Sequence, residues 1–214
     1  MKDKWLIVGV SAFFIAASYW VGTFFIKSEK AETIAKQDTA VFVRPHSPRM
    51  GVENAKVVVV EFLDPECESC RAVYSSVKDI LKEFEGKIQL VVRYAPFHAN
   101  SLFAIKILEA ARKQNKYWET LEVLFRSQPE WGSHHHPQPE KIWDFLPQVA
   151  GLDIERVRHE MNDPATFDQV ELDKEDGRKL GVNGTPTFFV NGKPLERLGM
   201  DELYGAIRQE IDKP

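Results

Sequence analysis

The segment KVVVVEFLDPECESCRAV, residues 56–73, most constrains the fold, because a strand signal in it leads directly into a helix signal. Its first seven residues form a continuous, largely β-branched run, which is typical of a strand buried on both faces. Asp64 and Pro65 follow and predict a helix N-cap and first helical position. Apolar residues at helical spacing then extend to Phe84, and Gly86 ends the helix. A buried strand followed by an amphipathic helix predicts an α/β fold.

The rest of the chain alternates strand and helix signals in the same way. A second strand is predicted at 87–97, and TPTFFVNGKPL at 185–195 predicts a strand, an Asn-Gly turn and a short partner strand. Helical patterns occupy the remaining stretches, at 105–111, 118–125, 142–146, 154–161, 165–180 and 203–211.

The N-terminal region differs from this pattern, because no charge occurs from Trp5 to Ile26. As a helix this run is about 33 Å long, enough to cross a hydrocarbon core of ~30 Å. Ala16 and Ser18 offer a signal-peptide cleavage site, but cleavage there leaves a strongly apolar new N-terminus, so an uncleaved anchor is favoured. The expected organisation is a flank at 1–4, a transmembrane signal anchor at 5–26, a stalk at 27–50 and a folded domain at 51–214.

The composition is that of an ordinary globular protein with an appendage. Hydrophobic residues make up 43% and charged residues 28% of the chain, and the net charge is −4. The absence of a basic excess argues against a nucleic-acid partner.

Cys67 and Cys70 are the only cysteines, and three chemistries compete to explain their spacing. A structural disulfide over so short a loop contributes only about 2 kcal/mol. A zinc site needs two further ligands, and the His134–His136 triplet lies far outside finger-like spacing. Redox exchange fits better, because a thiolate at a helix start is stabilised by unpaired N–H groups, and a second thiol one turn later can resolve a mixed disulfide.

Together, VVVVEFLDPECESCRAV and GVNGTPTFFVNGKPL resemble the thioredoxin superfamily, specifically its DsbA-like branch. The resemblance covers roughly residues 51–211 and implies a thioredoxin-like fold with a helical insertion at about 100–181. It also implies a thiol:disulfide oxidoreductase that needs no cofactor or metal.

The resemblance implies roles for particular residues. Cys67 matches the nucleophile and Cys70 the resolving thiol. Pro186 matches the cis-proline facing the cysteines, although a proline that merely opens a strand is the alternative. Thr185 before it would pair with an extended substrate.

Further positions near the cysteines carry weaker expectations. Glu61 matches a buried acid that accepts a proton, whereas the alternative is an edge-strand glutamate that reaches water. Glu68 and Ser69, between the cysteines, are expected to contact substrate. His98 is interpreted as a cap or packing residue.

The acidic residues around Cys67 predict the direction of exchange. Asp64, Glu66 and Glu68 should disfavour the thiolate and raise its pKa against the pull of the helix N-terminus. A reductase- or isomerase-leaning poise, nearer to thioredoxin than to DsbA, is therefore expected.

The resemblance to bacterial envelope proteins places the catalytic domain on the extracytoplasmic side of the cytoplasmic membrane, where disulfide traffic occurs. Protein thiols and disulfides are the expected substrates, and an unidentified redox partner protein is implied. The alternative function is an envelope copper-binding or delivery protein that uses the CxxC pair and the histidines, since Cu(I) favours paired thiolates.

Overall fold

The computed structural model describes residues 39–133 and 136–214, and its central element is a mixed sheet with strand order β1–β3–β2–β4–β5. β2 and β3 are parallel, and the other pairs are antiparallel. The predicted strands are confirmed, and Asn191 and Gly192 form the turn between β4 and β5 with φ of 47° and 79°. The strands are β1 (Arg49–Gly51), β2 (Val57–Leu63), β3 (Ile88–Tyr94), β4 (Thr187–Val190) and β5 (Lys193–Pro194).

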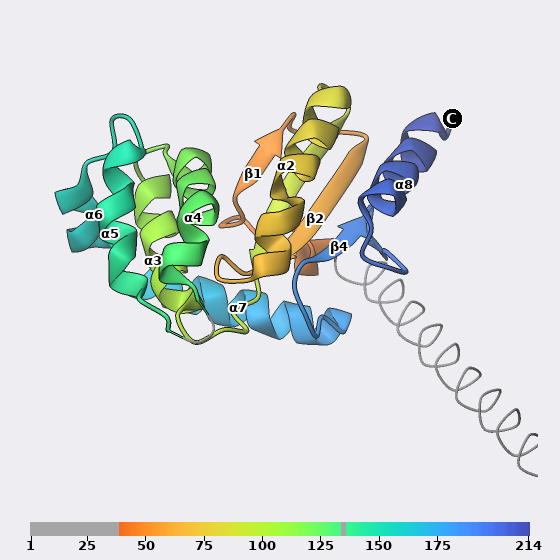
Figure 1. Cartoon of the computed structure of the whole chain (residues 1–214). Helices are drawn as coiled ribbons and strands as arrows, with labels where there is room; N and C mark the ends of the chain where they lie inside the picture. Colours follow the sequence, from red (N-terminus) through yellow and green to blue (C-terminus); the bar gives the residue numbers. More distant parts are fainter. Residues whose placement is uncertain (1–38, 134–135) are drawn as a thin grey trace, which may run out of the picture.

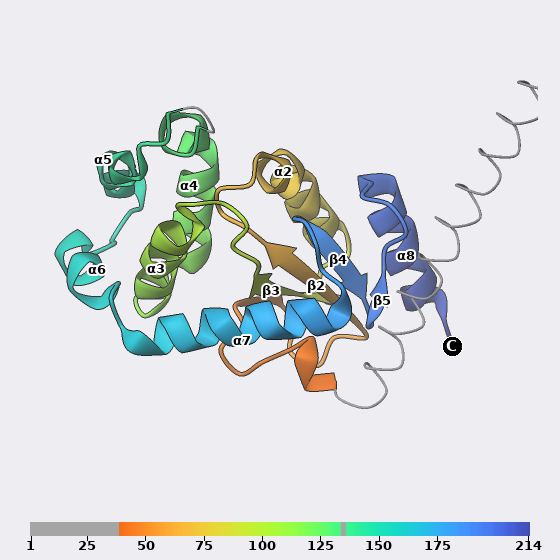
Figure 2. The same ribbon diagram turned by 90° about the horizontal axis from the view of Figure 1, so that it is seen from below.

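Helices cover both faces of this sheet. α2 (Glu68–Glu83) and α8 (Met200–Asp212) lie on one face, and α7 (Pro164–Leu180) crosses the other, as Figure 2 shows. Apolar side chains of β2, β4, α2 and α8 form one core layer, and those of β2, β3, β4 and the end of α7 form a second. The expected α/β class is therefore observed as three layers.

The helical insertion lies beside the sheet, between β3 and β4 in the chain (Figure 1). Its helices enclose a core of their own, which continues to Cys67 and Cys70. The predicted helices are confirmed. The elements before α7 are α3 (Ser101–Arg112), α4 (Tyr117–Trp131), η2 (Pro139–Lys141), α5 (Ile142–Phe145), η3 (Leu146–Gln148) and α6 (Ile154–Glu160).

Part of the expected stalk at 27–50 packs onto the sheet. Residues 39–50 include η1 (Thr39–Val41) and the first two residues of strand β1, and Val41 and Phe42 are buried in the second core layer. A short apolar run, Ala40 to Val43, between polar residues is too brief a pattern to indicate this packing from the sequence. Among the described residues no helix combines the length and apolar character needed to cross a membrane, and the predicted span 5–26 lies outside them.

Strand alternation decides which side chains meet the active-site helix. Val59 and Leu63 belong to the cores around α2, and because β-strand side chains alternate, Glu61 between them faces the same way. Phe62 and Arg93 point to the α7 face, where α7 approaches so closely that a Cβ on Gly177 would meet Phe62 at 3.2 Å.

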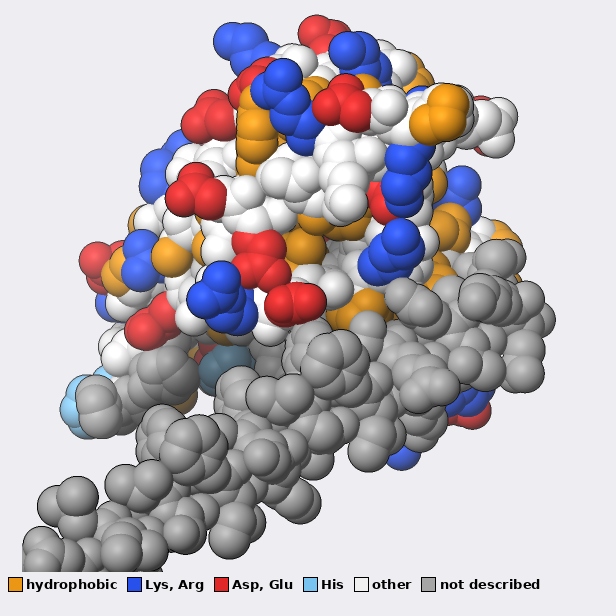
Figure 3. All heavy atoms as spheres, turned by 90° about the vertical axis from the view of Figure 1, so that its right-hand side faces the viewer, with side chains coloured by type: hydrophobic (Ala, Val, Ile, Leu, Met, Phe, Trp, Pro, Cys, Tyr) orange, Lys and Arg blue, Asp and Glu red, His pale blue; other side chains and the backbone are white. Residues whose placement is uncertain are grey.

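The face that carries α8 shows interspersed acidic and basic side chains rather than a field of one sign (Figure 3). This mixture agrees with the small net charge of −4. The described side chains that are visible in this view form no basic stripe that could follow a phosphate backbone.

Candidate active site

The turn between β2 and α2 is organised by Asp64, but not as the predicted N-cap. Cys67 occupies the N-cap position, and α2 begins at Glu68. The buried Asp64 carboxylate instead accepts hydrogen bonds from the backbone N–H groups of Glu66 at 2.9 Å, Phe97 at 2.8 Å and His98 at 3.2 Å. It thereby joins the two loops that follow the parallel strands β2 and β3.

Cys67 and Cys70 are both free thiols with opposite properties. The pKa of Cys67 falls from 9.0 to about 5. A hydrogen bond from the Cys70 thiol is the largest cause; burial opposes it, and the Thr185 side chain and the backbone N–H groups of Ser69 and Cys70 lower the pKa further. Cys70 is completely buried, and this burial, together with Cys67 and Glu61, raises its pKa. One thiol is therefore ionised near neutral pH and its neighbour is not.

The expected increase in the pKa of Cys67 is wrong in direction, and two of the three acids on which it rested, Asp64 and Glu66, are bonded elsewhere. Glu66 is buried, and its oxygens accept from the backbone N–H of Asn100 at 2.7 Å and from the Asn100 side chain at 2.8 Å. Asp64 faces backbone N–H groups and His98. Glu66 and Asp64 are close to Cys67 in the sequence, but their carboxylates interact with other groups and not with the Cys67 sulfur.

The Thr185–Pro186 peptide bond is cis, as the resemblance implied. The Cys67 thiol donates a hydrogen bond to the Thr185 carbonyl at 3.2 Å, so the cysteine pair and the Thr-Pro segment meet. In this reduced form the Thr185 carbonyl is occupied by the thiol. Glu68 and Ser69 are exposed beside Cys67, and their expected contact with substrate stays a prediction.

Glu61 lies on the central strand β2, which pairs with β3 on one side and β4 on the other, so the edge-strand alternative is wrong. Only 2% of the residue is exposed. Burial, and secondly the charge of Cys67, raise its pKa from 4.5 to about 8. Glu61 in turn raises the pKa of Cys70. A carboxyl group that can take or release a proton near neutral pH therefore lies by the two thiols.

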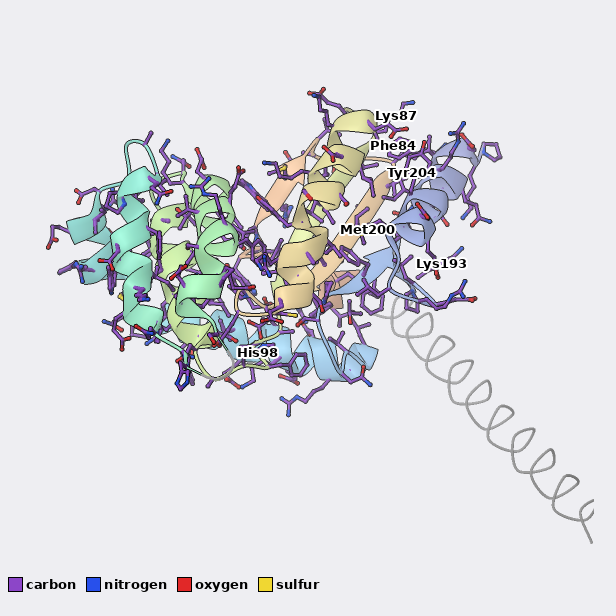
Figure 4. All side chains as sticks on the ribbon, in the orientation of Figure 1. Phe84, Lys87, His98, Lys193, Met200 and Tyr204 are labelled. Atoms are coloured by element: carbon purple, nitrogen blue, oxygen red, sulfur yellow. The ribbon has the colours of Figure 1, made fainter. Side chains whose placement is uncertain are left out.

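His98 is the residue that sequence reasoning undervalued. Its Nδ1 lies 2.8 Å from the Asp64 carboxylate. Burial alone would lower the pKa of His98, but Asp64, followed by Cys67 and Glu66, raises it overall. Figure 4 shows His98 at the end of the molecule where α2 begins. The available signal was topological: His98 and Asp64 both follow the carboxyl ends of parallel strands, which meet at one sheet edge.

The histidine triplet is described only in part. His136 is exposed, whereas His134 and His135 lie outside the described residues. Within the described ranges no group of three or more histidine, cysteine, aspartate or glutamate side chains is arranged to hold a metal ion. The copper alternative stays a prediction.

Comparisons with known proteins agree with this geometry. The thioredoxin family model matches residues 44–209. Disulfide bond formation protein D of Bacillus subtilis is 28% identical over 175 residues, covering 77% of each chain. The crystal structure of oxidised BdbD from Bacillus subtilis superposes with a TM-score of 0.69 and 27% identity, over 78% of this chain and 94% of that one. A thioredoxin-like oxidoreductase from Silicibacter pomeroyi gives 0.70 and 26%, over 82% and 98%.

A different kind of relative matches over a segment only. The Na(+)/H(+) antiporter NhaA of Herminiimonas arsenicoxydans is 32% identical over 145 residues, which are 68% of this chain and 22% of the antiporter. The chain thus spans about a fifth of that relative's length, and ion transport does not follow from the match. The family match over residues 44–209, the cysteine pair at a helix start and the cis Thr-Pro segment agree: this chain belongs to the thioredoxin family, in its branch of DsbA-like thiol–disulfide oxidoreductases.

Proposed function

We propose that the chain exchanges disulfides with extracytoplasmic proteins, with Cys67 as the attacking thiol and Cys70 as the resolving thiol. The observation that carries this proposal is the opposed ionisation of the pair: the pKa of Cys67 is lowered to about 5 while that of Cys70 is raised. The thiolate is the nucleophile in exchange, so only Cys67 is ready to react with an external partner.

The oxidising direction runs in two balanced steps. A thiolate of the reduced substrate attacks Cys67 Sγ in the enzyme disulfide, a mixed disulfide forms, and Cys70 leaves as a thiolate that takes a proton. The second substrate thiolate then attacks the substrate sulfur of the mixed disulfide. Cys67 leaves as a thiolate, the substrate is oxidised by two electrons, and the enzyme is reduced by two. Reduction of a substrate is the reverse sequence.

Glu61 supplies the proton that Cys70 needs and accepts it in the reverse direction. Its pKa of about 8 allows both states near neutral pH, which is the condition for efficient general acid–base catalysis. A water-exposed glutamate, with a pKa near 4.3, would be a weaker acid–base partner for a thiol.

The low pKa of Cys67 favours net disulfide formation. A pKa of about 5 lies between about 7 for thioredoxin and about 3.5 for DsbA, and stabilising the reduced form makes an enzyme more oxidising. The expected reductase- or isomerase-leaning poise rested on a raised pKa of Cys67, and the pKa is lowered instead. The name of the Bacillus subtilis relative, Disulfide bond formation protein D, also supports the oxidising direction.

The proposed location of the chain follows from its disulfide chemistry and from the apolar run near its N-terminus. Residues 5–26 would anchor the chain in the cytoplasmic membrane, with the catalytic domain outside the cytoplasm. A topology reporter fused after Pro214 should be active only on the extracytoplasmic side. Activity confined to the cytoplasm would overturn this location.

Mixed-disulfide trapping tests the assignment of the two thiols. Cys70→Ser should accumulate covalent adducts through Cys67 when Cys67 attacks a substrate disulfide, because no Cys70 thiol is then available to attack the mixed disulfide. Cys67→Ser should accumulate none, since the remaining thiol is buried and un-ionised. Equal trapping by both variants would reverse the roles.

A further inference from the structure

One side chain of the helical insertion reaches into the turn that carries Cys67. Gln128, near the end of α4, is 1% exposed. Its side-chain amide donates to the Pro65 carbonyl at 2.9 Å and to the Cys67 carbonyl at 3.0 Å. Because a primary amide has two N–H bonds, both donors are used on this turn.

The orientation of this amide is fixed from its other end. Arg71 Nε donates to Gln128 Oε1 at 2.9 Å. Arginine can only donate, so the oxygen of Gln128 must face Arg71 and the NH₂ group must face the two carbonyls. The contact is also closely packed: a Cβ on Gly132 would lie 3.2 Å from Gln128 Cγ and 3.5 Å from Glu66 Cγ.

The two carbonyls that Gln128 binds determine where the sulfur sits. The Cys67 carbonyl also accepts the Arg71 backbone N–H at 3.2 Å, which is the first helical bond at the start of α2. The Pro65 carbonyl belongs to the residue before Glu66, so the two carbonyls that Gln128 binds flank Glu66 in the chain. Holding both carbonyls fixes the peptide planes between the end of β2 and the first turn of α2, and hence the position of Cys67 relative to the N–H groups there.

We propose that Gln128 is a positioning residue through which the helical insertion holds the Cys67 turn and so sets the reactivity of Cys67. The inference rests on the proposed role of Cys67 as the attacking thiol. Gln128 acts through the turn, because its hydrogen bonds go to the backbone carbonyls of Pro65 and Cys67 and not to the Cys67 sulfur. The insertion therefore belongs to the working active site as well as covering it.

The test compares Gln128→Met with a matched control, Gln148→Met. Methionine keeps much of the volume of glutamine but has no donors. Gln148 is an exposed glutamine of the same insertion that also accepts from an arginine, Arg126, at 2.6 Å, but within the described residues it makes no hydrogen bond to the cysteine turn. The measurement is the rate of Cys67 alkylation by iodoacetamide against pH in the full chain, with the melting temperature recorded in parallel.

Gln128→Met should move the alkylation midpoint upward by about one pH unit, a tenfold change in the ionisation constant. From a midpoint of about 5, alkylation at pH 5 then slows about fivefold, while the rate at pH 7 changes little. Gln148→Met should keep the wild-type midpoint. A lower melting temperature of Gln128→Met with an unmoved midpoint would make Gln128 merely structural and overturn the inference.

Arg71→Met provides the second variant if Gln128→Met does not fold. Arg71 is exposed, and its loss leaves Gln128 in place without the donor that orients its amide. The midpoint should move in the same direction by a smaller amount, and no movement overturns the inference. Iodoacetamide needs no disulfide substrate, so this result is separate from the proposed function. Failure of wild-type protein to exchange with glutathione would reject the function alone.

Discussion

Both faces of the central sheet bury ionisable strand side chains, but within the described residues these side chains form ion pairs on one face and not on the other. On the α7 face, the fully buried Arg93 lies 2.7 Å from both Asp173 and Asp176. On the α2 face, Glu61 is almost as deeply buried, yet it forms no ion pair within the described part of the chain. These groups sit on adjacent strands, since Phe62, next to Glu61, is in register with Arg93. The difference between them is pairing, not depth.

Further partners complete the cluster on the α7 face. Arg44 binds Asp176 in a two-pronged contact at 2.8 and 2.9 Å, and His46 Nε2 lies 2.7 Å from Asp173. Burial would raise the pKa of Asp176, but Arg44 and Arg93 lower it overall. The lowered pKa keeps Asp176 ionised, and the ion pairs of the cluster hold α7 to the sheet. A buried acid with such partners is structural, whereas Glu61 without them has a shifted pKa and a proton to exchange.

The largest expected effect comes from breaking the paired cluster. Arg93→Met leaves two buried carboxylates with fewer partners, so the free energy of unfolding should fall by about 3–5 kcal/mol. Urea unfolding measures the change. Lys78→Met is the control, because Lys78 and Glu122 form an exposed pair whose side chains are 43% and 48% accessible. A loss for Arg93→Met no larger than that for the control would contradict the structural role.

Removing the lone acid should affect chemistry instead of stability. Glu61→Gln keeps the shape of the side chain but cannot exchange a proton, so steps that protonate or deprotonate Cys70 should slow about a hundredfold. The unfolding free energy at pH 7 should not fall, because an unfavourable buried carboxyl is removed. Stopped-flow measurement of the reducing direction, in which Cys70 loses its proton and attacks the mixed disulfide, provides the rate. An unchanged rate would show that water, not Glu61, carries the proton.

The pH dependence of stability should separate Glu61 from Cys67. The folded pKa of Glu61 is raised from 4.5 to about 8, so the folded state binds the extra proton and stability falls as pH rises through this window. The folded pKa of Cys67 is lowered from 9.0 to about 5, so its contribution is lost as pH falls towards 5 and grows as pH rises. In wild-type protein the two groups change the free energy of unfolding in opposite directions as the pH rises, so their effects partly cancel.

Single variants expose each slope in reduced protein. Glu61→Gln should become more stable from pH 5 to 8, and Cys67→Ser should become less stable over the same range, each by at most about 1.4 kcal/mol per pH unit. Urea unfolding at four pH values distinguishes them, and groups common to both variants cancel. Parallel curves for the two variants would mean that these groups do not titrate as described.

The smallest expected effect concerns His98. His98→Gln keeps a hydrogen-bonding side chain near Asp64 but removes the positive charge that interacts with Cys67. The pKa of Cys67 should rise by less than one unit, because the His98 side chain is 26% exposed and solvent screens its charge. Thiolate absorbance against pH measures it. A fall in the Cys67 pKa would contradict this electrostatic role.

Features set by local pattern could be predicted from the sequence. The valine run of β2 needs a buried strand, the helical spacing after it needs a covered face, and Asn191-Gly192 needs a tight turn. The cysteine pair was identified from its spacing at a predicted helix start, whereas the cis Thr185-Pro186 bond and the buried acid were reached through the resemblance. β1 was missed because three residues carry too little pattern.

Features set by tertiary contacts could not be predicted. The direction of the Cys67 pKa depends on where Glu66 points, and its partner Asn100 lies 34 residues away in the sequence. Gln128 reaches Pro65 across 63 residues, and no local pattern marks such a contact. The partners of Arg93 lie 80 and 83 residues away. The sequence shows which charged and polar groups are present, but the tertiary structure determines which of them form hydrogen bonds and ion pairs.

The long helix α7 has a mechanical consequence. Its 17 residues form a rod about 25 Å long that runs beneath both the insertion and the sheet (Figure 2). Val170 packs into the core of the insertion, Asp173 and Asp176 are fastened to the sheet, and the rod ends at Leu180, shortly before the Thr185-Pro186 segment. Because α7 is a continuous helix that is held to the sheet near its middle, a rotation at one of its ends moves the other end as well. Tilting of the insertion would therefore displace the loop that faces Cys67.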